Sequence, residues 1–309
     1  MNVLVTGGAG FIGSNLVRAL LERGDDVRVL DNFSTGSRDN LADVEGDVEL
    51  VEGELRSYER VHNAVRGVEL VFHQGALPSV PRSVQDPLTT SAVNVEGTLN
   101  VLLAARDEGI RRVVVASSSS VYGNSGELPR VESQAPDPIA PYAVAKLAAE
   151  RYCVSFSRVY ELEAVALRYF NVFGPHQDPT SQYSAVVPKF ISAIAAGEPV
   201  PIYGDGDQSR DFTYVGNVVA ANLLAADADG VNGEILNIAS GRSETVNHLA
   251  ELLGRVLERP VEKEFLPERT GDVRDSWADV SAARRLLGYE PAVGFEDGLR
   301  LTADAFVGV

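Results

Sequence analysis

The chain has little of what several protein classes depend on. Its 309 residues include one cysteine, Cys153, which excludes a disulfide framework or thiolate metal cluster and fits a reducing, cytoplasmic compartment. No apolar run approaches the ~18 residues that a membrane span needs. The chain opens on the strand-like run Asn2-Val3-Leu4-Val5, without a charged and apolar leader, so we expect no signal peptide.

Positive charge is also scarce. The formal net charge is -17 at pH 7, and arginine supplies every basic residue except Lys146, Lys189 and Lys263. An acidic surface repels nucleic acid and anionic lipid, so we expect neither of them as a partner. An anionic substrate must therefore be met by a local set of arginines.

A glycine-rich turn lies between the first expected strand, residues 2–6, and a helix expected at 14–23. Its glycines Gly7, Gly10 and Gly13 permit a tight turn and let the backbone approach a pyrophosphate. The helix N-terminus then stabilises the phosphate charge. Glycines at this spacing also occur in ordinary strand–helix turns, so the pattern needs support from elsewhere in the chain.

That support is an acidic residue at the required distance. Asp31 ends the next expected strand, residues 27–30. A carboxylate at this place accepts hydrogen bonds from the ribose hydroxyls of adenosine and repels a 2′-phosphate. The combination predicts a dinucleotide site that takes NAD rather than NADP.

Small residues follow the expected strand 68–73. Gln74, Gly75 and Ala76 occupy its carboxyl end, where small side chains suit the close approach of a cofactor. The last residue of the strand, His73, is expected to be structural rather than catalytic.

Two further positions leave alternatives open. Glu54, just past the expected strand 47–53, either reaches the adenine edge or is a solvated acid. Asn94, in the first turn of a helix expected at 94–106, either touches the cofactor or caps the helix.

A tyrosine and a lysine begin the helix expected at 143–160. Tyr142 and Lys146 stand four residues apart and therefore project from one helix face. A nearby ammonium lowers the pKa of a phenol from about 10, and such a phenol can take a proton from an alcohol and return it. Ser118, past the expected strand 112–116, can share that proton. Chance pairs at this spacing only pack together, but the dinucleotide site upstream favours a catalytic pair.

Strands and helices alternate through most of the chain, which predicts an α/β fold with a doubly wound parallel sheet. We expect an NAD-binding domain at residues 1–168 that also includes about 213–242. Residues 169–212 and 243–309 are expected to form a smaller α/β substrate-binding lobe over the carboxyl edge of the sheet.

Together the motifs resemble the extended short-chain dehydrogenase/reductase superfamily, and within it the NAD-dependent nucleotide-sugar epimerases, most closely those of the UDP-glucose and UDP-N-acetylglucosamine 4-epimerase type. The residues that carry the resemblance are Thr6–Gly13 (TGGAGFIG), Asp31–Gly36 (DNFSTG), Ser118 with Tyr142 and Lys146, and Arg168–Asn171 (RYFN). The resemblance implies a Rossmann-like fold, tightly bound NAD, a UDP-sugar substrate, a transient 4-keto sugar and a homodimer.

The resemblance also implies roles for individual residues. Tyr142 takes the proton of the sugar 4-hydroxyl, Lys146 holds down its pKa, and Ser118 bonds the same oxygen. Cofactor contacts are implied at Gly7, Gly10, Phe11, Ile12, Gly13, Asp31, Asn32, Ser34, Thr35, Gly36, Glu54, Leu55, Gln74, Gly75, Ala76, Asn94, Ser117, Tyr142, Lys146 and Tyr169. Substrate contacts are implied at Ser79, Arg82, Ser118, Asn171, Val187, Tyr203, Arg210, Arg269, Asp272 and Ser276.

Three positions bear on the reaction and the sugar. Related dehydratases carry an Asp-Glu pair where this chain has Ser119 and Ser120, so elimination to a 4-keto-6-deoxy sugar is disfavoured. Ser276 resembles a pocket-gating position that is aromatic in relatives; a serine there either leaves room for an N-acetyl group or only packs under the sugar while another group fills the space. The alternatives are a dTDP-glucose 4,6-dehydratase-like lyase, a UDP-glucuronate epimerase and a non-catalytic NAD-binding sensor.

Overall fold

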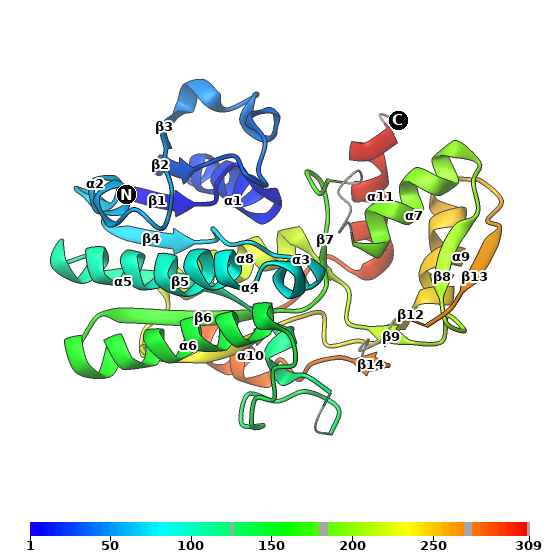
Figure 1. Cartoon of the computed structure of the whole chain (residues 1–309). Coiled ribbons are helices and arrows are strands. Elements are labelled where there is room, and N and C mark those ends of the chain that lie inside the picture. The colour runs from blue at the N-terminus through cyan, green and yellow to red at the C-terminus, as the bar shows by residue number, and fades with distance from the viewer. Residues whose placement is uncertain (125–126, 179–184, 269–273, 308–309) are drawn as a thin grey trace.

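A seven-stranded parallel sheet forms the centre of the molecule (Figure 1). The computed structural model describes residues 1–124, 127–178, 185–268 and 274–307. The strand order is β11-β6-β5-β4-β1-β2-β3. The strands are β1 (Asn2–Thr6), β2 (Asp26–Asp31), β3 (Val48–Glu52), β4 (Leu70–His73), β5 (Arg112–Ser118), β6 (Glu163–Tyr169) and β11 (Ile235–Ile238). The expected doubly wound α/β sheet is confirmed, and its order reverses between β1 and β4, where ligands bind in such folds.

Alternating side chains of each strand enter two separate cores. Val3 and Val5 of β1 pack on one face of the sheet, and Leu4 packs on the other. One face is covered by α1 (Phe11–Glu22), α8 (Val215–Asp227) and α10 (Ser281–Leu287). The other is covered by α2 (Tyr58–Val65), α5 (Gly97–Asp107) and α6 (Pro141–Tyr160). Both faces are thus buried, which explains why the strands read as unbroken Val and Leu runs.

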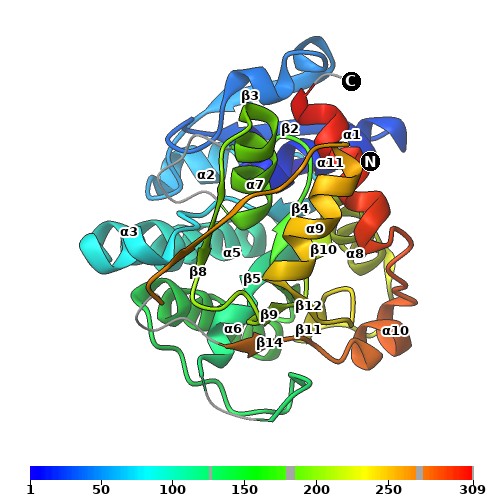
Figure 2. The same ribbon diagram turned by 90° about the vertical axis from the view of Figure 1, so that its right-hand side faces the viewer.

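A smaller lobe stands beyond the strand ends and has a third core of its own (Figure 2). Its helices are α7 (Val186–Ala196), α9 (Val246–Val256) and α11 (Phe295–Val307), packed against one another. Its short strands are β8 (Val200–Tyr203) with β13 (Lys263–Leu266), and β9 (Ser209–Arg210) with β12 (Glu244–Thr245) and β14 (Asp275–Ser276). The parallel pair β7 (Val172–Phe173) and β10 (Thr213–Tyr214) lies where the chain enters and leaves the lobe. The domain boundaries expected from the sequence stay a prediction.

One segment has more helix than its two prolines suggest. The stretch 77–83 contains Pro78 and Pro81, yet α3 (Val80–Gln85) begins inside it. The Ser79 hydroxyl caps this helix by accepting from the backbone N–H of Arg82. Pro81 lies in the first turn, where its missing N–H is not needed.

A second difference concerns Asn94. The chain is already helical from α4 (Pro87–Ser91) through the π-helical turn η3 (Ala92–Glu96) to α5, so Asn94 is an interior residue and not a cap. The remaining short helical turns are η1 (Arg38–Leu41), η2 (Glu45–Asp47) and η4 (Ser119–Tyr122). Among the described residues we find no helix with the length and apolar character that crossing a membrane requires.

Candidate active site

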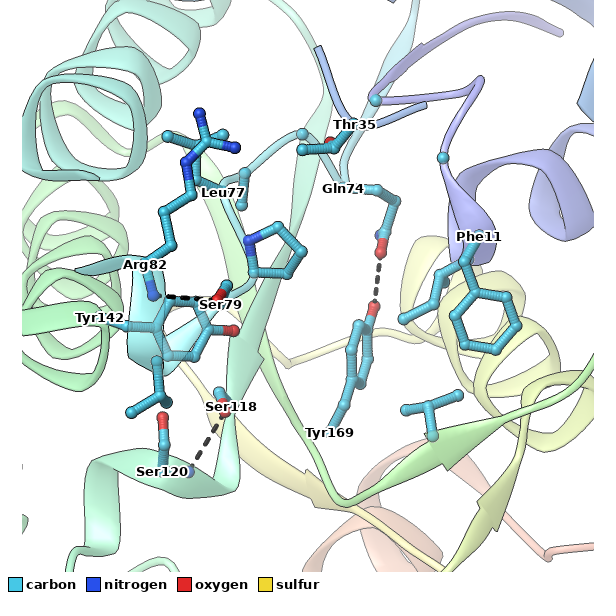
Figure 3. A pocket seen from close by; sticks show the side chains of 18 of the residues that line it. Phe11, Thr35, Gln74, Leu77, Ser79, Arg82, Ser118, Ser120, Tyr142 and Tyr169 are labelled. Carbon is cyan, nitrogen blue, oxygen red and sulfur yellow. Dashed lines mark hydrogen bonds between the residues drawn. The ribbon is translucent and has the colours of Figure 1, made fainter. Parts of the chain in front are cut away.

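A cleft of about 1440 Å³ lies between the strand ends and the smaller lobe (Figure 3). It is large enough for two ligands of nucleotide size, since single-ligand pockets are roughly 300–1,000 Å³. The expected cofactor contacts that line it are Gly7, Gly10, Phe11, Ile12, Gly13, Asp31, Asn32, Ser34, Thr35, Gly36, Glu54, Leu55, Gln74, Gly75, Ala76, Ser117, Tyr142 and Tyr169. Asn94 and Lys146 are expected contacts that are not among its lining residues.

The glycine turn leaves no room for side chains. Gly7 has a φ of +69°, and a Cβ on it would lie 2.6 Å from the backbone of Gly75. A Cβ on Gly13 would lie 2.1 Å from the carbonyl oxygen of Gly7. Helix α1 begins after Gly10 with no side-chain cap and no acid in its first turn. Its first N–H groups therefore face the cleft without a side-chain acceptor, as the pyrophosphate of a dinucleotide requires.

Asp31 joins the glycine turn to the loop after β2. One carboxylate oxygen accepts from the N–H of Ala9 at 2.9 Å, and the other accepts from the N–H of Phe33 at 2.8 Å. Burial raises the pKa of Asp31, and these backbone hydrogen bonds oppose the rise. Each oxygen keeps acceptor capacity, so the carboxylate can still receive ribose hydroxyls.

Glu54 lines the cleft as an ion-paired residue. Its carboxylate accepts from the side-chain amide of Asn32 at 3.1 Å and pairs with Arg56 at 2.9 Å. The hydrogen bond from Arg56 lowers the pKa of Glu54. The carboxylate is therefore held in place at the edge of the cleft, a position that the sequence left open.

Across the cleft, Gln74 is fixed by two partners, of which Figure 3 shows Tyr169. The Tyr169 hydroxyl lies 3.1 Å from its side-chain oxygen, and its amide nitrogen donates to Asn222 at 2.9 Å. Asn222 also donates to the Tyr169 hydroxyl at 2.9 Å. Burial raises the pKa of Tyr169 to about 12, so this hydroxyl stays protonated. No pattern in the sequence indicates Asn222, because only the fold brings α8 beside Gln74 and Tyr169.

His73 belongs to a buried chain of hydrogen bonds beneath the cleft. Thr98 donates its only hydroxyl proton to the carbonyl of Asn94, so it must accept from Nε2–H of His73 at 2.9 Å. The Nδ1 atom of His73 then accepts from the Thr6 hydroxyl at 2.7 Å. Thr6 in turn accepts from the N–H of Gly75. Burial lowers the pKa of His73 to about 3, so the ring is neutral and structural.

Asn94 extends this chain and does not reach the cleft. Its side-chain oxygen accepts from the N–H of Leu77 at 2.8 Å, and its amide donates to the Leu77 carbonyl at 3.1 Å. Neither of the expected roles, cofactor contact or helix cap, describes this geometry. Asn94 instead holds the loop that follows β4.

The expected catalytic residues meet where β5 ends and α6 begins. Tyr142 lies in the first turn of α6 and lines the cleft together with Ser118 (Figure 3). The Nζ atom of Lys146 lies 6.0 Å from the centre of the Tyr142 ring and donates to the carbonyl of Ala116 at 2.8 Å. Lys146 therefore stands behind the phenol rather than in the cleft.

The expected pKa of Tyr142 needs a correction. Burial raises the pKa of its phenol, and Ser118 is the group that lowers it. Burial likewise lowers the pKa of Lys146 to about 8, and Glu150 opposes that fall. The sequence argument counted the positive charge of the lysine but not the cost of burying a phenolate. Among the described residues, the fold alone therefore does not bring the pKa of this phenol below its ordinary value.

Eight of the ten expected substrate residues line the main cleft or the pocket next to it. Ser79, Arg82, Ser118, Asn171, Arg210 and Ser276 line the main cleft. Val187 and Tyr203 line an adjoining pocket of about 240 Å³, which Asn171 and Arg210 share. Arg269 and Asp272 fall outside the described residues.

Short strands position Arg210 beside Ser276. The two residues are paired across β9 and β14. The next residue, Asp211, is fully buried and accepts from the N–H groups of Ser240 and Gly241, which locks β9 to the loop after β11. The guanidinium of Arg210 is thereby carried to the boundary of the two pockets.

Several lining residues were not singled out from the sequence, namely Asp39, Asn40, Val93, Arg130, His176 and Gln177. Arg130 is 3% exposed, and its Nη1 has no hydrogen-bond partner among the described residues. The backbone of Arg130 is held at the cleft by a parallel β-bridge to Ala278, which lies far along the chain. Within the described ranges, no group of three or more His, Cys, Asp or Glu side chains could hold a metal ion.

Comparison with known protein families agrees with this geometry. The model of the NAD dependent epimerase/dehydratase family matches residues 3–239. The chain belongs to this family. NAD is accordingly its cofactor, and the bare glycine turn, the uncapped α1 and Asp31 fit that group.

Similar proteins cover the whole chain. The UDP-glucose 4-epimerase of Mycolicibacterium smegmatis is 38% identical over 99% of this chain and 98% of its own length. The crystal structure of the Thermotoga maritima UDP-glucose 4-epimerase with UDP-glucose has a TM-score of 0.95 at 39% identity, covering 100% of this chain and 99% of that one. A UDP-N-acetylglucosamine 4-epimerase from Methanobrevibacter ruminantium, in complex with UDP-N-acetylmuramic acid, has a TM-score of 0.95 at 42% identity, covering 99% and 98%.

Proposed function

We propose that this chain is a cytoplasmic UDP-sugar 4-epimerase that keeps its NAD bound and acts through a transient 4-keto sugar. One observation carries the proposal. The phenol of Tyr142 and the hydroxyl of Ser118 line the same cleft as the glycine turn and Asp31. A proton acceptor and a dinucleotide site thus face one space.

In this mechanism Tyr142 accepts the proton of the sugar 4-hydroxyl, and Ser118 hydrogen-bonds the same oxygen. NAD held by the glycine turn and Asp31 would supply the hydride acceptor, the returning hydride and, while oxidised, a positive charge. The ammonium of Lys146 adds a second positive charge behind the ring. Tyr142 returns the proton to the carbonyl oxygen when hydride re-enters on the opposite face, which inverts the carbinol.

The nucleotide half of the substrate supplies most of the affinity. Arg210 offers a planar donor set for phosphate oxygens at the boundary of the two pockets. Tyr203 and Val187 line the smaller pocket, which we assign to the uracil. An anchored nucleotide lets the sugar turn between the two hydride transfers without leaving the cleft.

The sugar is proposed to be glucose or galactose, and N-acetylglucosamine or N-acetylgalactosamine as well. Ser276 lines the cleft beside Arg210 with a small side chain, which leaves space for an acetamido group. Ser119 and Ser120 line it where related dehydratases carry an acid pair, so a 4-keto-6-deoxy product is not expected.

A specific observation favours UDP-glucuronate as a second candidate substrate. Arg130 lines the cleft near Ser119 and Ser120 with a buried guanidinium, and burial lowers its pKa. Its Nη2 donates to the Gly123 carbonyl, and Nη1 has no hydrogen-bond partner among the described residues. Nη1 is closed off from the cleft as the side chains stand, so a small movement of its neighbours would let a sugar carboxylate supply the acceptor that it lacks.

We further propose a homodimer. Helices α3 and α4 pack on α6, and each of the three presents a large apolar side chain to solvent: Val84 of α3 is 63% exposed, Leu88 of α4 83% and Val144 of α6 51%. Apolar side chains gathered on neighbouring helices favour burial against a second copy.

A substrate panel tests the proposed function. The purified protein is incubated without added NAD with UDP-galactose, UDP-N-acetylgalactosamine, UDP-glucuronate or dTDP-glucose, and the products are identified by NMR. Inversion at C4 of at least one UDP-sugar is expected. A 4-keto-6-deoxy product would instead favour the lyase, and binding of NAD with no conversion of any sugar would favour the non-catalytic sensor.

A further inference from the structure

A buried ion pair lies directly behind the catalytic residues. The carboxylate of Glu150 is 0% exposed and accepts from both Nε and Nη2 of Arg168 at 2.8 Å. It also accepts from the Ser117 hydroxyl at 2.6 Å. Neither Glu150 nor the pair it forms was singled out from the sequence, and neither touches the cleft.

The position of Glu150 ties three elements together. Glu150 lies one turn after Lys146 on α6, so the two side chains share a helix face. Its partner Ser117 immediately precedes Ser118 at the end of β5, and its partner Arg168 immediately precedes Tyr169 at the end of β6. Each of its contacts therefore lies one residue, or one helical turn, from a residue of the active site.

The pair also sets the charge behind the phenol. Lys146 and Arg168 are cations and Glu150 is an anion, all of them buried, so together they carry one net positive charge. The charge of Glu150 acts on Lys146 and opposes the burial that lowers the pKa of Lys146 to about 8. The nearby His73 has a pKa of about 3 and Cys153 one of about 12, so both are neutral.

A buried ion pair at this place needs a reason beyond stability. Isolated buried pairs contribute little net stability, because removing two charges from water costs about as much as their attraction returns. The arginine alone would repel Lys146 and favour its neutral amine. With Arg168 paired to Glu150, a carboxylate stays one helical turn from Lys146, and Arg168 supplies the hydrogen bonds that the buried carboxylate needs.

We propose that Glu150, held by Arg168, is the positioning residue of the active site that keeps Lys146 charged behind Tyr142. This inference rests on the proposed function for its role in turnover, but the charge state of Lys146 can be measured without any substrate.

The test uses the scarcity of lysine. Protein labelled with lysine carrying ¹³C at Cε gives signals from only Lys146, Lys189 and Lys263, and a Lys146→Met variant identifies the first. The signal of Lys146 is titrated with pH in the NAD-loaded wild type and in Glu150→Gln. We expect the pKa of Lys146 to fall by about 1 to 2 pH units in the variant, because a buried opposite charge close to it is lost.

A matched control separates charge from lost packing. Glu163 lies at the opposite end of β6 and pairs with the buried Arg112 at 2.7 Å. The Glu163→Gln variant should therefore leave the pKa of Lys146 unchanged. Partial unfolding cannot imitate the expected result, since an exposed lysine titrates near 10.4, in the other direction. If Glu150→Gln does not fold, the Glu150→Gln/Arg168→Met double variant removes both charges, and a smaller fall is expected.

Turnover gives the second readout. If one of the UDP-sugars is converted, the alkaline limb of kcat should move to lower pH in Glu150→Gln by the same amount as the lysine titration, and not in Glu163→Gln. An unchanged or raised pKa of Lys146 in Glu150→Gln overturns the inference even if the enzyme epimerises sugars. A lowered pKa in a protein that converts no sugar supports it and counts against the proposed function alone.

Discussion

Asp31 and Ala9 are joined by a hydrogen bond of 2.9 Å from the backbone N–H of Ala9 to the Asp31 carboxylate. The residue that ends β2 therefore also holds the glycine turn that follows β1. One carboxylate then keeps the glycine turn in shape, and we propose that it also receives the ribose of NAD.

The double task of Asp31 predicts a large effect on cofactor binding. Asp31→Ala should weaken NAD binding roughly 10- to 100-fold, because both the ribose acceptor and the loop anchor are lost. Binding is measured by calorimetry on protein stripped of NAD. Asp26→Asn, an exposed acid at the start of the same strand, is the matched control and should bind like the wild type. Equal affinities of Asp31→Ala and Asp26→Asn would contradict this role.

Tyr142→Phe separates proton transfer from binding. Removing the hydroxyl should lower kcat by about 10²- to 10⁴-fold, the usual range for a general acid–base group. The phenyl ring remains, so NAD content after gel filtration should not change. Turnover at the wild-type rate would instead support a role for the chain as a sensor or scaffold.

The buried His73 predicts how stability depends on pH. Its folded pKa of about 3 lies below the ordinary value of 6.5, so the unfolded chain binds the proton first. The stabilisation is fully present above pH 6.5 and is lost as the pH falls from 6.5 towards 3. Between pH 7 and pH 5 the unfolding free energy should fall about 2 kcal/mol more in the wild type than in His73→Gln.

Urea unfolding at the two pH values measures this difference, because other titrating groups contribute alike to both proteins. Equal falls in the wild type and His73→Gln would show that the ring is not held neutral in the folded protein.

The apolar face of α3, α4 and α6 predicts the assembly. Leu88→Glu places a charge at the most exposed of its large side chains and should convert a dimer to a monomer in light scattering after gel filtration. Leu301→Glu on α11, 46% exposed, is the control and should leave the mass unchanged. A wild-type protein that is already monomeric at micromolar concentration would refute the proposed dimer.

Local chemistry explains what the sequence could predict. The Val and Leu runs, the glycine turn and Asp31 lie close together in the chain. In each of them a single requirement explains the residue type: burial of the strands, close approach of the backbone to a pyrophosphate, or a carboxylate that accepts from a ribose. Tyr142 and Lys146 likewise share a helix face through their spacing alone. The doubly wound sheet and the family followed from these local patterns, and both are confirmed.

Contacts between distant segments explain what the sequence missed. Asn222 reaches Gln74 from a helix that is 148 residues away in the chain, and Arg130 depends on a bridge to Ala278. The pKa of Tyr142 was misjudged for the same reason, because the burial that raises it comes from the fold and not from its neighbours in sequence.

The fate of the hydrogen at C4 tests the central claim most directly. UDP-galactose carrying deuterium at C4 is incubated in ordinary water with the protein as purified, and the UDP-glucose formed is examined by NMR and mass spectrometry. If hydride leaves and returns within the cleft opposite Tyr142, the deuterium is retained at C4 of the inverted sugar. Loss of the label to water, or no inversion of this or any other UDP-sugar, would contradict the account.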